Sequence, residues 1–299
     1  MILDGKTVSK TIKDKVKEYI NTTDARLKLS IVQVGNNPAS NTYVKNKLKA
    51  CEECNIVSNL VKIEDPDEYD RCFTIPYNLM GHDDSTALML QLPLPKGWDE
   101  HYFLNNIPKL MDADCLTEDS LGSFYSNNDP KIAPCTAQGV MDLLDYYNIP
   151  VEGKRALVIG RSNIVGKPVA HLLTNRNATV TVAHSKTSKE DLLRLFATSH
   201  IVVSAVGKSD IISEVDADQY FKDHRHEFYN SFETISSDRV IIDVGINRDE
   251  NGKLCGDFSE KFKEKYSYAY SPVPGGVGPL TVANLLYNTV KLHNMQVTS

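Results

Sequence analysis

Residues 155–183 constrain the fold of this chain more than any other stretch. Residues 156–159 form a short apolar run typical of a buried strand, and Gly160 ends it. Apolar side chains then recur at helical spacing, at Val165, Val169, Leu172 and Leu173. A second apolar run follows at residues 178–183. The stretch therefore predicts a strand, a tight turn, a helix and a parallel strand, which is the βαβ unit of an α/β fold.

The turn in this unit carries glycines in a pattern that suits a phosphate. Such a turn directs backbone N–H groups and a helix N-terminus at one point. The pattern is Gly160-x-Ser162-x-x-x-Gly166 rather than the common Gly-x-Gly-x-x-Gly, and Ser162 takes the place of the glycine that lets the backbone approach a pyrophosphate. An ordinary βα turn can have the same pattern, so the motif alone leaves both interpretations open.

The end of the second strand indicates which nucleotide such a turn would bind. An NAD site usually has a carboxylate about 20 residues after the glycine turn, where it binds the ribose 2′-hydroxyl. This chain has His184-Ser185-Lys186-Thr187 there, and Arg161 in the turn can reach the same place. A hydroxyl with cations favours the 2′-phosphate of NADP, although the same residues also suit a solvated loop.

Composition and charge set limits on the function. A chain of 299 residues has two domains by default, and its net charge of −6 argues against nucleic acid or an anionic membrane as the main partner. The N-terminus lacks the apolar core of a signal peptide, and no apolar run reaches the ~20 residues of a membrane span. We therefore expect a cytoplasmic protein.

The cysteines indicate neither disulfides nor a metal site. There are six, and only Cys51 and Cys54 form a C-x-x-C pair, without a second pair to complete a zinc site. Their surroundings are helical in pattern, so we expect reduced, half-buried helix thiols and no metal.

The rest of the chain alternates strands and helices, which predicts a mostly parallel sheet in each half. Ser40 or Asn41 is expected to cap the second helix. Residues 126–134 and 210–238 are expected to be loops, the latter a surface elaboration with a helix. The expected helices are residues 8–20, 41–54, 71–80, 103–111, 136–147 and 282–292, and the other expected strands are 27–34, 57–63, 87–92, the end of 197–206, and 240–244.

A loop rich in proline and glycine precedes the last helix. Residues 271–281 hold three prolines and three glycines and lead directly into that helix, with Thr281 near its start. Proline fixes the backbone and glycine permits its close approach to a ligand. We interpret the loop as one wall of a binding site, and a plain linker is the alternative.

Four motifs in this order give the chain a resemblance to a known family. They are Ser40-x-x-Tyr43-x-x-x-Lys47, Gln91-Leu-Pro-Leu-Pro95, Gly160-Arg-Ser-x-x-Val-Gly-x-Pro168 and Pro272-Val-Pro-Gly-Gly-Val-Gly-Pro279. The chain resembles, nearly end to end, the bifunctional methylenetetrahydrofolate dehydrogenase/cyclohydrolase (FolD) family. The resemblance implies oxidation of 5,10-methylenetetrahydrofolate by NADP+ and hydrolysis of the resulting methenyl compound to 10-formyltetrahydrofolate, a part of one-carbon metabolism that serves purine biosynthesis.

The resemblance also implies an architecture. It implies an α/β fold with a folate-binding catalytic domain at residues 1–135, joined by the C-terminal helix 279–296, and a Rossmann-type NADP-binding domain at residues 136–278. A cleft between the two would hold the folate. The family suggests a homodimer formed through the Rossmann-type domains.

The site residues follow from the same resemblance. Lys47 would be the acid/base of the hydrolysis, because burial could favour its neutral form. Gln91 would hydrogen-bond Lys47, Tyr43 would stack on the folate ring system, and Asp114 would accept hydrogen bonds from the pterin. The other implied substrate contacts are Ser40, Leu92, Pro93, Pro272, Gly275 and Gly276. The implied cofactor contacts are Gly160, Arg161, Ser162, Val165, Gly166, His184, Ser185 and Ile246.

The chain departs from the family pattern beside Asp114. Cys115 stands where the family usually has glycine, and it could tilt the Asp114 carboxylate or crowd the pterin. Two alternatives accompany this interpretation. One is a two-domain NADP enzyme of the shikimate- or amino-acid-dehydrogenase type, and the other is a non-catalytic folate or nucleotide binder, which only Cys115 makes plausible.

Overall fold

The computed structural model describes residues 1–80, 84–126, 132–224 and 238–298. The chain divides into two compact units. One comprises Met1–Val8 and Thr136–Thr281, and is called the C-terminal unit here; the other comprises Ser9–Cys135 and Val282–Ser299, and is called the N-terminal unit. The sequence pattern does not indicate that the first eight residues belong with the second half.

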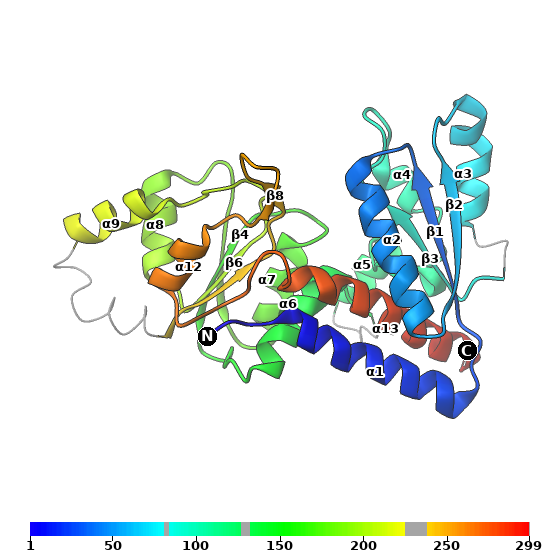
Figure 1. Ribbon diagram of the computed structural model, residues 1–299, viewed down its shortest axis with the longest axis horizontal. Helices are drawn as coiled ribbons and strands as arrows, with labels where there is room; N and C mark the ends of the chain where they lie inside the picture. Colours follow the sequence, from blue (N-terminus) through cyan, green and yellow to red (C-terminus); the bar gives the residue numbers. More distant parts are fainter. Residues whose placement is uncertain (81–83, 127–131, 225–237, 299) are drawn as a thin grey trace. The chain divides into compact units, whose positions relative to one another are not determined.

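The C-terminal unit is built on a five-stranded parallel sheet (Figure 1). Its strands are β4 (Arg155–Ile159), β5 (Thr179–Ala183), β6 (Ile201–Ser204), β7 (Val240–Asp243) and β10 (Ala269–Tyr270). They lie in the order β10-β7-β6-β4-β5, so the chain reverses its direction of travel across the sheet after β5. The carboxyl ends of β4 and β6 therefore form the crevice at which α/β sheets bind ligands.

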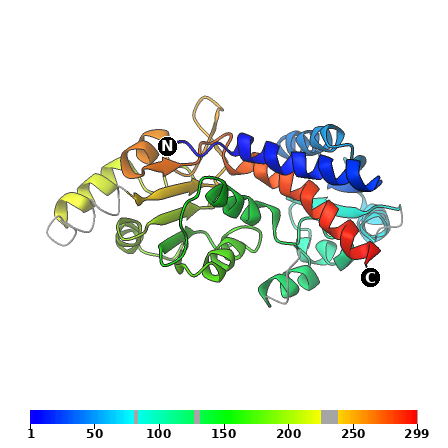
Figure 2. The ribbon, with the colours of Figure 1, turned by 90° about the horizontal axis from the view of Figure 1, so that it is seen from below.

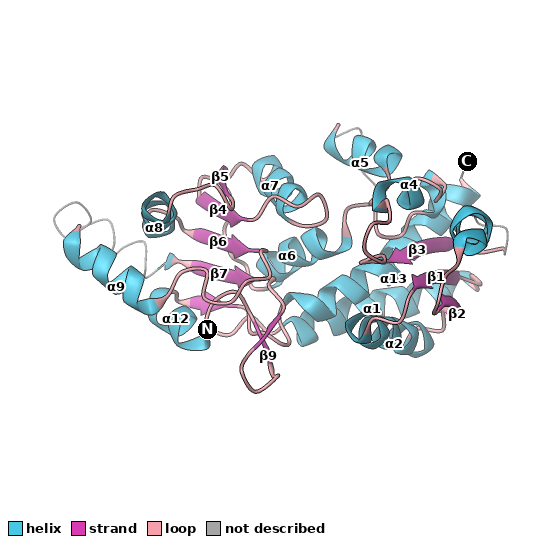
Figure 3. Ribbon diagram, turned by 90° about the horizontal axis from the view of Figure 1, so that it is seen from above, coloured by secondary structure: helices cyan, strands magenta, loops and turns pink. Residues whose placement is uncertain are grey.

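Helices cover both faces of this sheet. Helices α8 (Lys189–Ala197), α9 (Glu214–Asp223) and α12 (Glu260–Tyr266) pack on one face, where Phe196 and Phe262 lie in the same buried cluster as strand residues Leu157 and Val202. Helices α6 (Cys135–Tyr146) and α7 (Gly166–Asn175) lie on the other side in Figure 1. A small antiparallel pair, β8 (Asn247–Arg248) and β9 (Leu254–Cys255), stands apart from the sheet (Figure 3).

The first residues of the chain extend the edge of that sheet. Ile2 forms a parallel bridge with Tyr270, and Leu3 N donates to the Tyr270 carbonyl at 2.8 Å. Asp4 N donates to the Tyr147 hydroxyl at 2.9 Å, just after α6. Met1–Asp4 thus continues the sheet beyond β10, which explains why this segment groups with the second half of the chain.

The N-terminal unit has a three-stranded parallel sheet of order β2-β1-β3. Its strands are β1 (Lys28–Val34), β2 (Val57–Ile63) and β3 (Ala87–Gln91), and β1 and β3 are almost wholly buried. Helices α2 (Pro38–Glu53), α3 (Ile75–Leu79), α4 (Glu100–Leu104) and α5 (Glu118–Tyr125) belong to this unit, with a π-helical turn at Asp70–Thr74 and a 3-10 turn at Lys109–Met111.

Two long helices lie side by side in this unit. Helix α1 (Gly5–Thr23) and helix α13 (Val277–Val297) run next to each other in Figures 1 and 2. The Tyr19 hydroxyl meets His293 Nδ1 at 2.9 Å and donates to Asn294 Oδ1 at 2.7 Å. Near the end of α13, Gln296 donates to the carbonyls of Thr86 and Leu110, so the C-terminal helix is tied to the loops beside β3.

Most of the predicted elements are confirmed, and several details differ from the prediction. Helix α2 begins at Pro38 with Asn37 as its cap, not Ser40 or Asn41, because proline suits the first helical turn. Helix α13 begins at Val277 rather than at residue 282, within the proline-rich loop. Helices α5, α8 and α12 and the short strands β8, β9 and β10 were not predicted. The expected loops at 126–134 and 210–238 fall partly outside the described residues, although α9 is the helix expected within the second.

Candidate functional site

The start of α2 brings one of the implied substrate residues into the interior. Asn37 Oδ1 accepts hydrogen bonds from Ala39 N at 2.9 Å and Ser40 N at 3.3 Å, which begins the helix. Ser40 is then 3% exposed, and among the described residues its hydroxyl is the one buried side-chain oxygen or nitrogen without a hydrogen-bond partner. Because burying an unpaired hydroxyl costs free energy, this position is suited to a ligand that supplies the missing partner.

Lys47 and Gln91 form a buried pair. Lys47 Nζ donates to Gln91 Oε1 at 3.0 Å and lies 3.3 Å from Met89 Sδ, and both Lys47 and Gln91 are 7% exposed. Met89 and Gln91 lie two residues apart on β3, so their side chains share the face that meets α2. Gln91 Nε2 donates to the Leu92 carbonyl at 2.6 Å, which directs the amide oxygen toward Lys47.

Tyr43 lies one helical turn before Lys47 and is more exposed. Its exposed fraction is 36%, so this face of α2 passes from an accessible aromatic ring to a buried amine within one turn. Leu92 is half-buried, Pro93 is exposed, and the peptide between them is cis. The implied residues Ser40, Tyr43, Lys47, Gln91, Leu92 and Pro93 thus all belong to α2 and the carboxyl end of β3.

Asp114 lies on a short loop beside the same strand. Asp112 forms a bridge with Leu88 of β3, and Ala113 N donates to the Leu88 carbonyl at 3.1 Å. The buried Asp112 carboxylate accepts from the backbone of Leu116 and Thr117, both at 2.9 Å, and burial raises its pKa. Asp112 therefore shapes the loop, and Asp114 is half-buried on it.

Cys115 has a left-handed backbone conformation, which glycine adopts more easily than any other residue. Its φ is +57°, a left-handed conformation that costs a residue other than glycine of order 1 kcal/mol. Its thiol is fully buried and contacts the Ile132 carbonyl at 3.9 Å. The cysteine therefore keeps the turn that glycine would make, and its side chain fills the interior.

The glycine turn after β4 requires both of its glycines. Gly160 has a φ of +125°, and a Cβ there would lie 2.6 Å from the Ala205 carbonyl oxygen. A Cβ on Gly166 would lie 2.3 Å from the Gly160 carbonyl oxygen. The start of α7 thus lies directly against the turn, the close approach typical of a phosphate-binding βα turn. Ser162 Oγ accepts from Val165 N at 3.2 Å and Gly166 N at 3.4 Å, so the serine orders the amides of this turn.

Strand register brings the other implied cofactor residues to the same edge. Ile159 pairs with Ala183 and with Ser204, and Ser204 pairs with Asp243, so residues 160, 184, 205 and 244 leave adjacent strands at one level. Arg161, Ser185 and Ile246 are exposed and His184 is half-buried at this edge. The His184 backbone N–H donates to Thr187 Oγ1 at 2.9 Å, which folds residues 184–187 into a turn without a carboxylate.

Two buried carboxylates, which the sequence interpretation left without a role, hold the loops at this edge. Asp257 accepts from Ser204 Oγ at 2.7 Å and from the N–H groups of Val206 and Lys208, both at 2.9 Å. Asp243 accepts from three backbone N–H groups, those of Gly245, Asp257 and Phe258, at 3.0 to 3.1 Å.

The glycines beside these carboxylates leave no room for a side chain. A Cβ on Gly245 would lie 2.0 Å from the Asp257 carboxylate, and a Cβ on Gly256 would lie 2.0 Å from that of Asp243. Burial raises the pKa of Asp243 to about 6, against the effect of its backbone hydrogen bonds and of Lys263, whose Nζ lies 3.8 Å away.

The proline-glycine loop packs against the start of the chain. Gly275 has a φ of +109°, Gly276 N donates to the Pro272 carbonyl at 2.8 Å, and Gly5 N donates to the Gly275 carbonyl at 2.9 Å. A Cβ on Gly5 would lie 1.7 Å from the Gly276 carbonyl oxygen. Pro272, Gly275 and Gly276 belong to the C-terminal unit, whereas the other implied substrate residues belong to the N-terminal unit.

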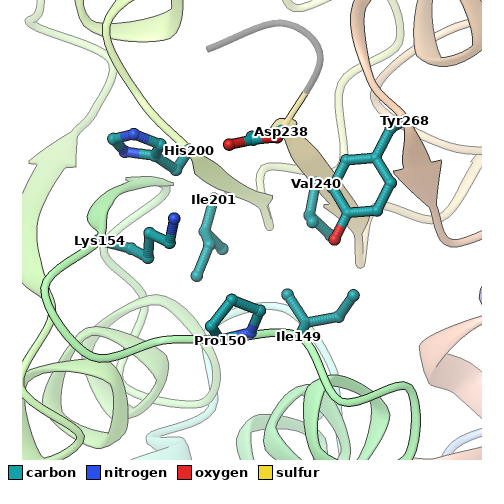
Figure 4. A pocket seen from close by; sticks show the side chains of 8 residues that line it. All are labelled: Ile149, Pro150, Lys154, His200, Ile201, Asp238, Val240 and Tyr268. Atoms are coloured by element: carbon teal, nitrogen blue, oxygen red, sulfur yellow. The ribbon is translucent and has the colours of Figure 1, made fainter. Parts of the chain in front are cut away.

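A shallow pocket in the C-terminal unit contains none of the implied residues (Figure 4). It lies at the amino ends of the strands, opposite the glycine turn, since Ile201 begins β6 and Val240 begins β7. It is lined by Ile149, Pro150, Lys154, His200, Ile201, Asp238, Val240 and Tyr268.

The cysteines are free thiols. Cys51 and Cys54 are fully buried rather than half-buried, and burial raises the pKa of Cys51 to about 12, so it stays protonated. Within the described residues, no three His, Cys, Asp or Glu side chains gather as a metal site would require. No helix of that part of the chain is long and apolar enough to cross a membrane.

Both halves of the chain match the domains of a known protein family. Residues 3–114 match the catalytic domain of tetrahydrofolate dehydrogenase/cyclohydrolase, and residues 134–219 and 228–297 match its NAD(P)-binding domain. The bifunctional protein FolD of Bdellovibrio bacteriovorus is 40% identical over 297 residues, which cover 98% of this chain and 96% of that protein.

Solved structures of similar chains agree with this. The bifunctional FolD enzyme of Campylobacter jejuni is 35% identical, with 99% of each chain covered and a TM-score of 0.86. The Trypanosoma brucei enzyme, solved with NADP cofactor and an inhibitor, is 32% identical, with 100% of this chain and 99% of that chain covered and a TM-score of 0.87.

Proposed function

This chain belongs to the tetrahydrofolate dehydrogenase/cyclohydrolase family, and we propose that it catalyses both reactions of that name. In the first, 5,10-methylenetetrahydrofolate transfers a hydride to NADP+ and becomes the 5,10-methenyl cation. In the second, water adds to that cation and the ring opens to 10-formyltetrahydrofolate with release of one proton. The rival reading as a different two-domain dehydrogenase does not account for the full-length family match.

The buried pair of Lys47 and Gln91 is the observation that carries this proposal. Hydrolysis of the cation requires a group that takes a proton from the attacking water and returns one to the departing ring nitrogen. The Lys47 amine, 3.0 Å from Gln91 Oε1 and shielded from bulk water, is suited to this exchange. The amide of Gln91 holds the amine in place, because its own N–H is bonded to the Leu92 carbonyl.

Other residues of the N-terminal unit are suited to binding the folate. We assign Tyr43 to stacking on the folate ring system, Asp114 to the pterin amino and ring N–H groups, and the unpaired Ser40 hydroxyl to a polar group of the ligand. Leu92 and Pro93 would line the same site. Pro272, Gly275 and Gly276, on the rigid loop of the other unit, complete the proposed substrate contacts.

The C-terminal unit is suited to NADP, which accepts the hydride when bound. Gly160 and Gly166 have no room for a Cβ, so the start of α7 approaches the turn closely, as in a turn that binds a pyrophosphate. Arg161 and Ser185 leave adjacent strands at the same level, and residues 184–187 carry no carboxylate, which favours a 2′-phosphate over a free hydroxyl. Ser162, Val165, Gly166, His184 and Ile246 are the remaining proposed contacts.

We assign the binding of folate and of NADP to different parts of the chain. Residues 1–135 with 279–296 would bind folate, and residues 136–278 would bind NADP. The folate is the small-molecule partner. The family suggests a homodimer through the Rossmann-type unit. We place the protein in the cytoplasm, and its net charge of −6 argues against nucleic acid or an anionic membrane as the main partner.

A coupled spectroscopic assay tests this function. The purified chain is mixed with 5,10-methylenetetrahydrofolate and NADP+, and the absorbances of NADPH and of the methenyl compound are followed together. We expect NADPH to form with little methenyl accumulation, because the second reaction consumes it. Absence of NADPH formation at saturating substrates would refute the dehydrogenase assignment and favour a non-catalytic binder.

A further inference from the structure

The Asp114 loop is tied to the C-terminal helix through one buried side chain. Asn288, on α13, is 1% exposed. Its Nδ2 donates to the Ala113 carbonyl at 2.9 Å and to the Ala133 carbonyl at 3.0 Å, and it lies 3.4 Å from Cys135 Sγ. All of these residues belong to the N-terminal unit.

The first of these contacts acts on the backbone of Asp114. The Ala113 carbonyl and the Asp114 N–H belong to one planar peptide group, so a bond to that carbonyl orients the plane from which the Asp114 side chain projects. The Cys135 thiol reaches the same carbonyl at 3.3 Å. Two side chains distant in sequence therefore hold the peptide directly before Asp114.

The contact with Cys135 leads to a group that senses the charge of Asp114. Burial, followed by the charge of Asp114, raises the pKa of the Cys135 thiol well above its usual range, while Lys47 acts in the opposite sense. Cys135 is thus a protonated thiol that donates to the Ala113 carbonyl, directly before Asp114. The Asn288 side-chain amide donates to the Cys135 sulfur at 3.4 Å.

A buried asparagine on a packed helix would be destabilising without such bonds. Its neighbours Leu285, Leu286 and Leu292 are fully buried apolar residues, so a leucine would suit the packing of α13. One of the three contacts of Asn288 reaches the loop of Asp114, and the other two reach Ala133 and Cys135 just before and at the start of α6; none of them lies within α13. This distinguishes it from Thr289, whose hydroxyl donates to the Leu285 carbonyl of the same helix at 3.0 Å.

We propose that Asn288 is a positioning residue for the pterin: through the Ala113 carbonyl and the Cys135 thiol it sets the direction of the Asp114 carboxylate and so the affinity for the reduced folate. The inference rests on the proposed function, in which Asp114 binds the pterin. It adds that the C-terminal helix determines folate affinity through a residue that does not touch the folate.

A double-mutant cycle tests this positioning role. The affinity for tetrahydrofolate is measured by titration calorimetry for the wild type, Asn288→Ala, Asp114→Ala and the double variant. Asn288→Ala should weaken binding about tenfold, and in the Asp114→Ala background the same change should weaken it by less than about twofold. The KM for NADP+ should stay within about twofold of the wild type in Asn288→Ala, which a general loss of structure would not allow.

Thr289→Val is the matched control, because it removes a neighbouring buried hydrogen bond without touching the Asp114 loop. It should lower the melting temperature and leave folate affinity unchanged. If Asn288→Ala does not fold, Asn288→Ser, which keeps one donor, is measured in the same cycle.

The outcomes separate this inference from the function on which it rests. Unchanged folate affinity in Asn288→Ala, or an equal loss with and without Asp114, would overturn the positioning role while the wild-type turnover stands. A wild type that neither binds tetrahydrofolate nor reduces NADP+ would overturn both.

Discussion

Replacing Lys47 by glutamine separates the two proposed reactions. Lys47→Gln removes the buried amine and leaves a shorter side chain whose amide cannot exchange protons. Acid/base catalysis by a positioned side chain contributes about 10²–10⁴-fold, so the hydrolysis barrier should rise by about 3–5 kcal/mol. Hydride transfer needs no proton transfer, so the dehydrogenase rate should fall less, and the methenyl compound should accumulate.

Folate binding should survive the substitution. Tyr43 and Asp114 carry the proposed contacts with the folate ring system, and neither depends on the bond between Lys47 and Gln91. We expect the affinity for tetrahydrofolate to stay within about threefold of the wild type, because the bond that is lost lies within the protein. The assay follows the decay of methenyltetrahydrofolate absorbance in the presence of each variant, with spontaneous hydrolysis subtracted.

Helix α2 supplies matched controls. Lys45 and Lys49 flank Lys47 at two residues on either side, and both are exposed. Since residues two apart do not share a helix face, Lys45→Gln and Lys49→Gln remove the same charge without reaching Gln91. Both controls should hydrolyse the methenyl compound at the wild-type rate. Hydrolysis by Lys47→Gln at a rate close to that of the controls would refute the acid/base role.

Three further predictions follow from the C-terminal unit. Arg161→Ala should weaken NADP+ binding about 10- to 100-fold and NAD+ binding hardly at all, because a charged contact to the 2′-phosphate is lost; equal weakening of both, measured as KM, would contradict this role. Asp243→Asn should lower the free energy of unfolding in urea by about 2 kcal/mol, because both carboxylate oxygens accept backbone N–H groups and an amide has only one oxygen that can accept. An unchanged urea midpoint would show that these hydrogen bonds of Asp243 do not stabilise the fold. Burial, followed by the charges of Arg155 and Lys154, lowers the pKa of His200 below 6.5. As the pH falls, His200 therefore binds a proton in the unfolded chain before it does so in the folded chain. The stability that the neutral imidazole contributes is then lost as the pH falls below 6.5. His200→Gln should flatten this part of the stability profile, and identical profiles for both proteins would contradict it.

Local pattern was enough to predict most of the fold. The apolar runs of β1 and β4 and the helical stripes of α1 and α6 are confirmed because each of these elements has a buried face, and β2 is confirmed as a strand although its residues are half-buried or exposed. Helix α5 escaped prediction because its eight residues, Glu118–Tyr125, carry only a short apolar pattern. Helix α13 starts early because Gly278 and Pro279 lie in its first turn, where neither breaks a helix.

The candidate site was predictable only in part, because its support comes from distant segments. The spacing of Tyr43 and Lys47 shows that they share a helix face, but no spacing reveals that Asn288 reaches Ala113, 175 residues earlier. The same holds for Asp257, which bonds Ser204 and two loop amides across the sheet edge. Sequence motifs therefore identified residues proposed to touch ligands, and the structure identified the residues that hold them.

A crystal structure with bound NADP+ and a folate substrate analogue tests the central claim most directly, through the distance from Lys47 Nζ to the one-carbon unit of the folate. We predict direct or single-water contact, within about 3 Å for each hydrogen bond, with the pterin on Asp114. A folate bound elsewhere, with the Lys47 and Gln91 pair still sealed from it, would contradict the account.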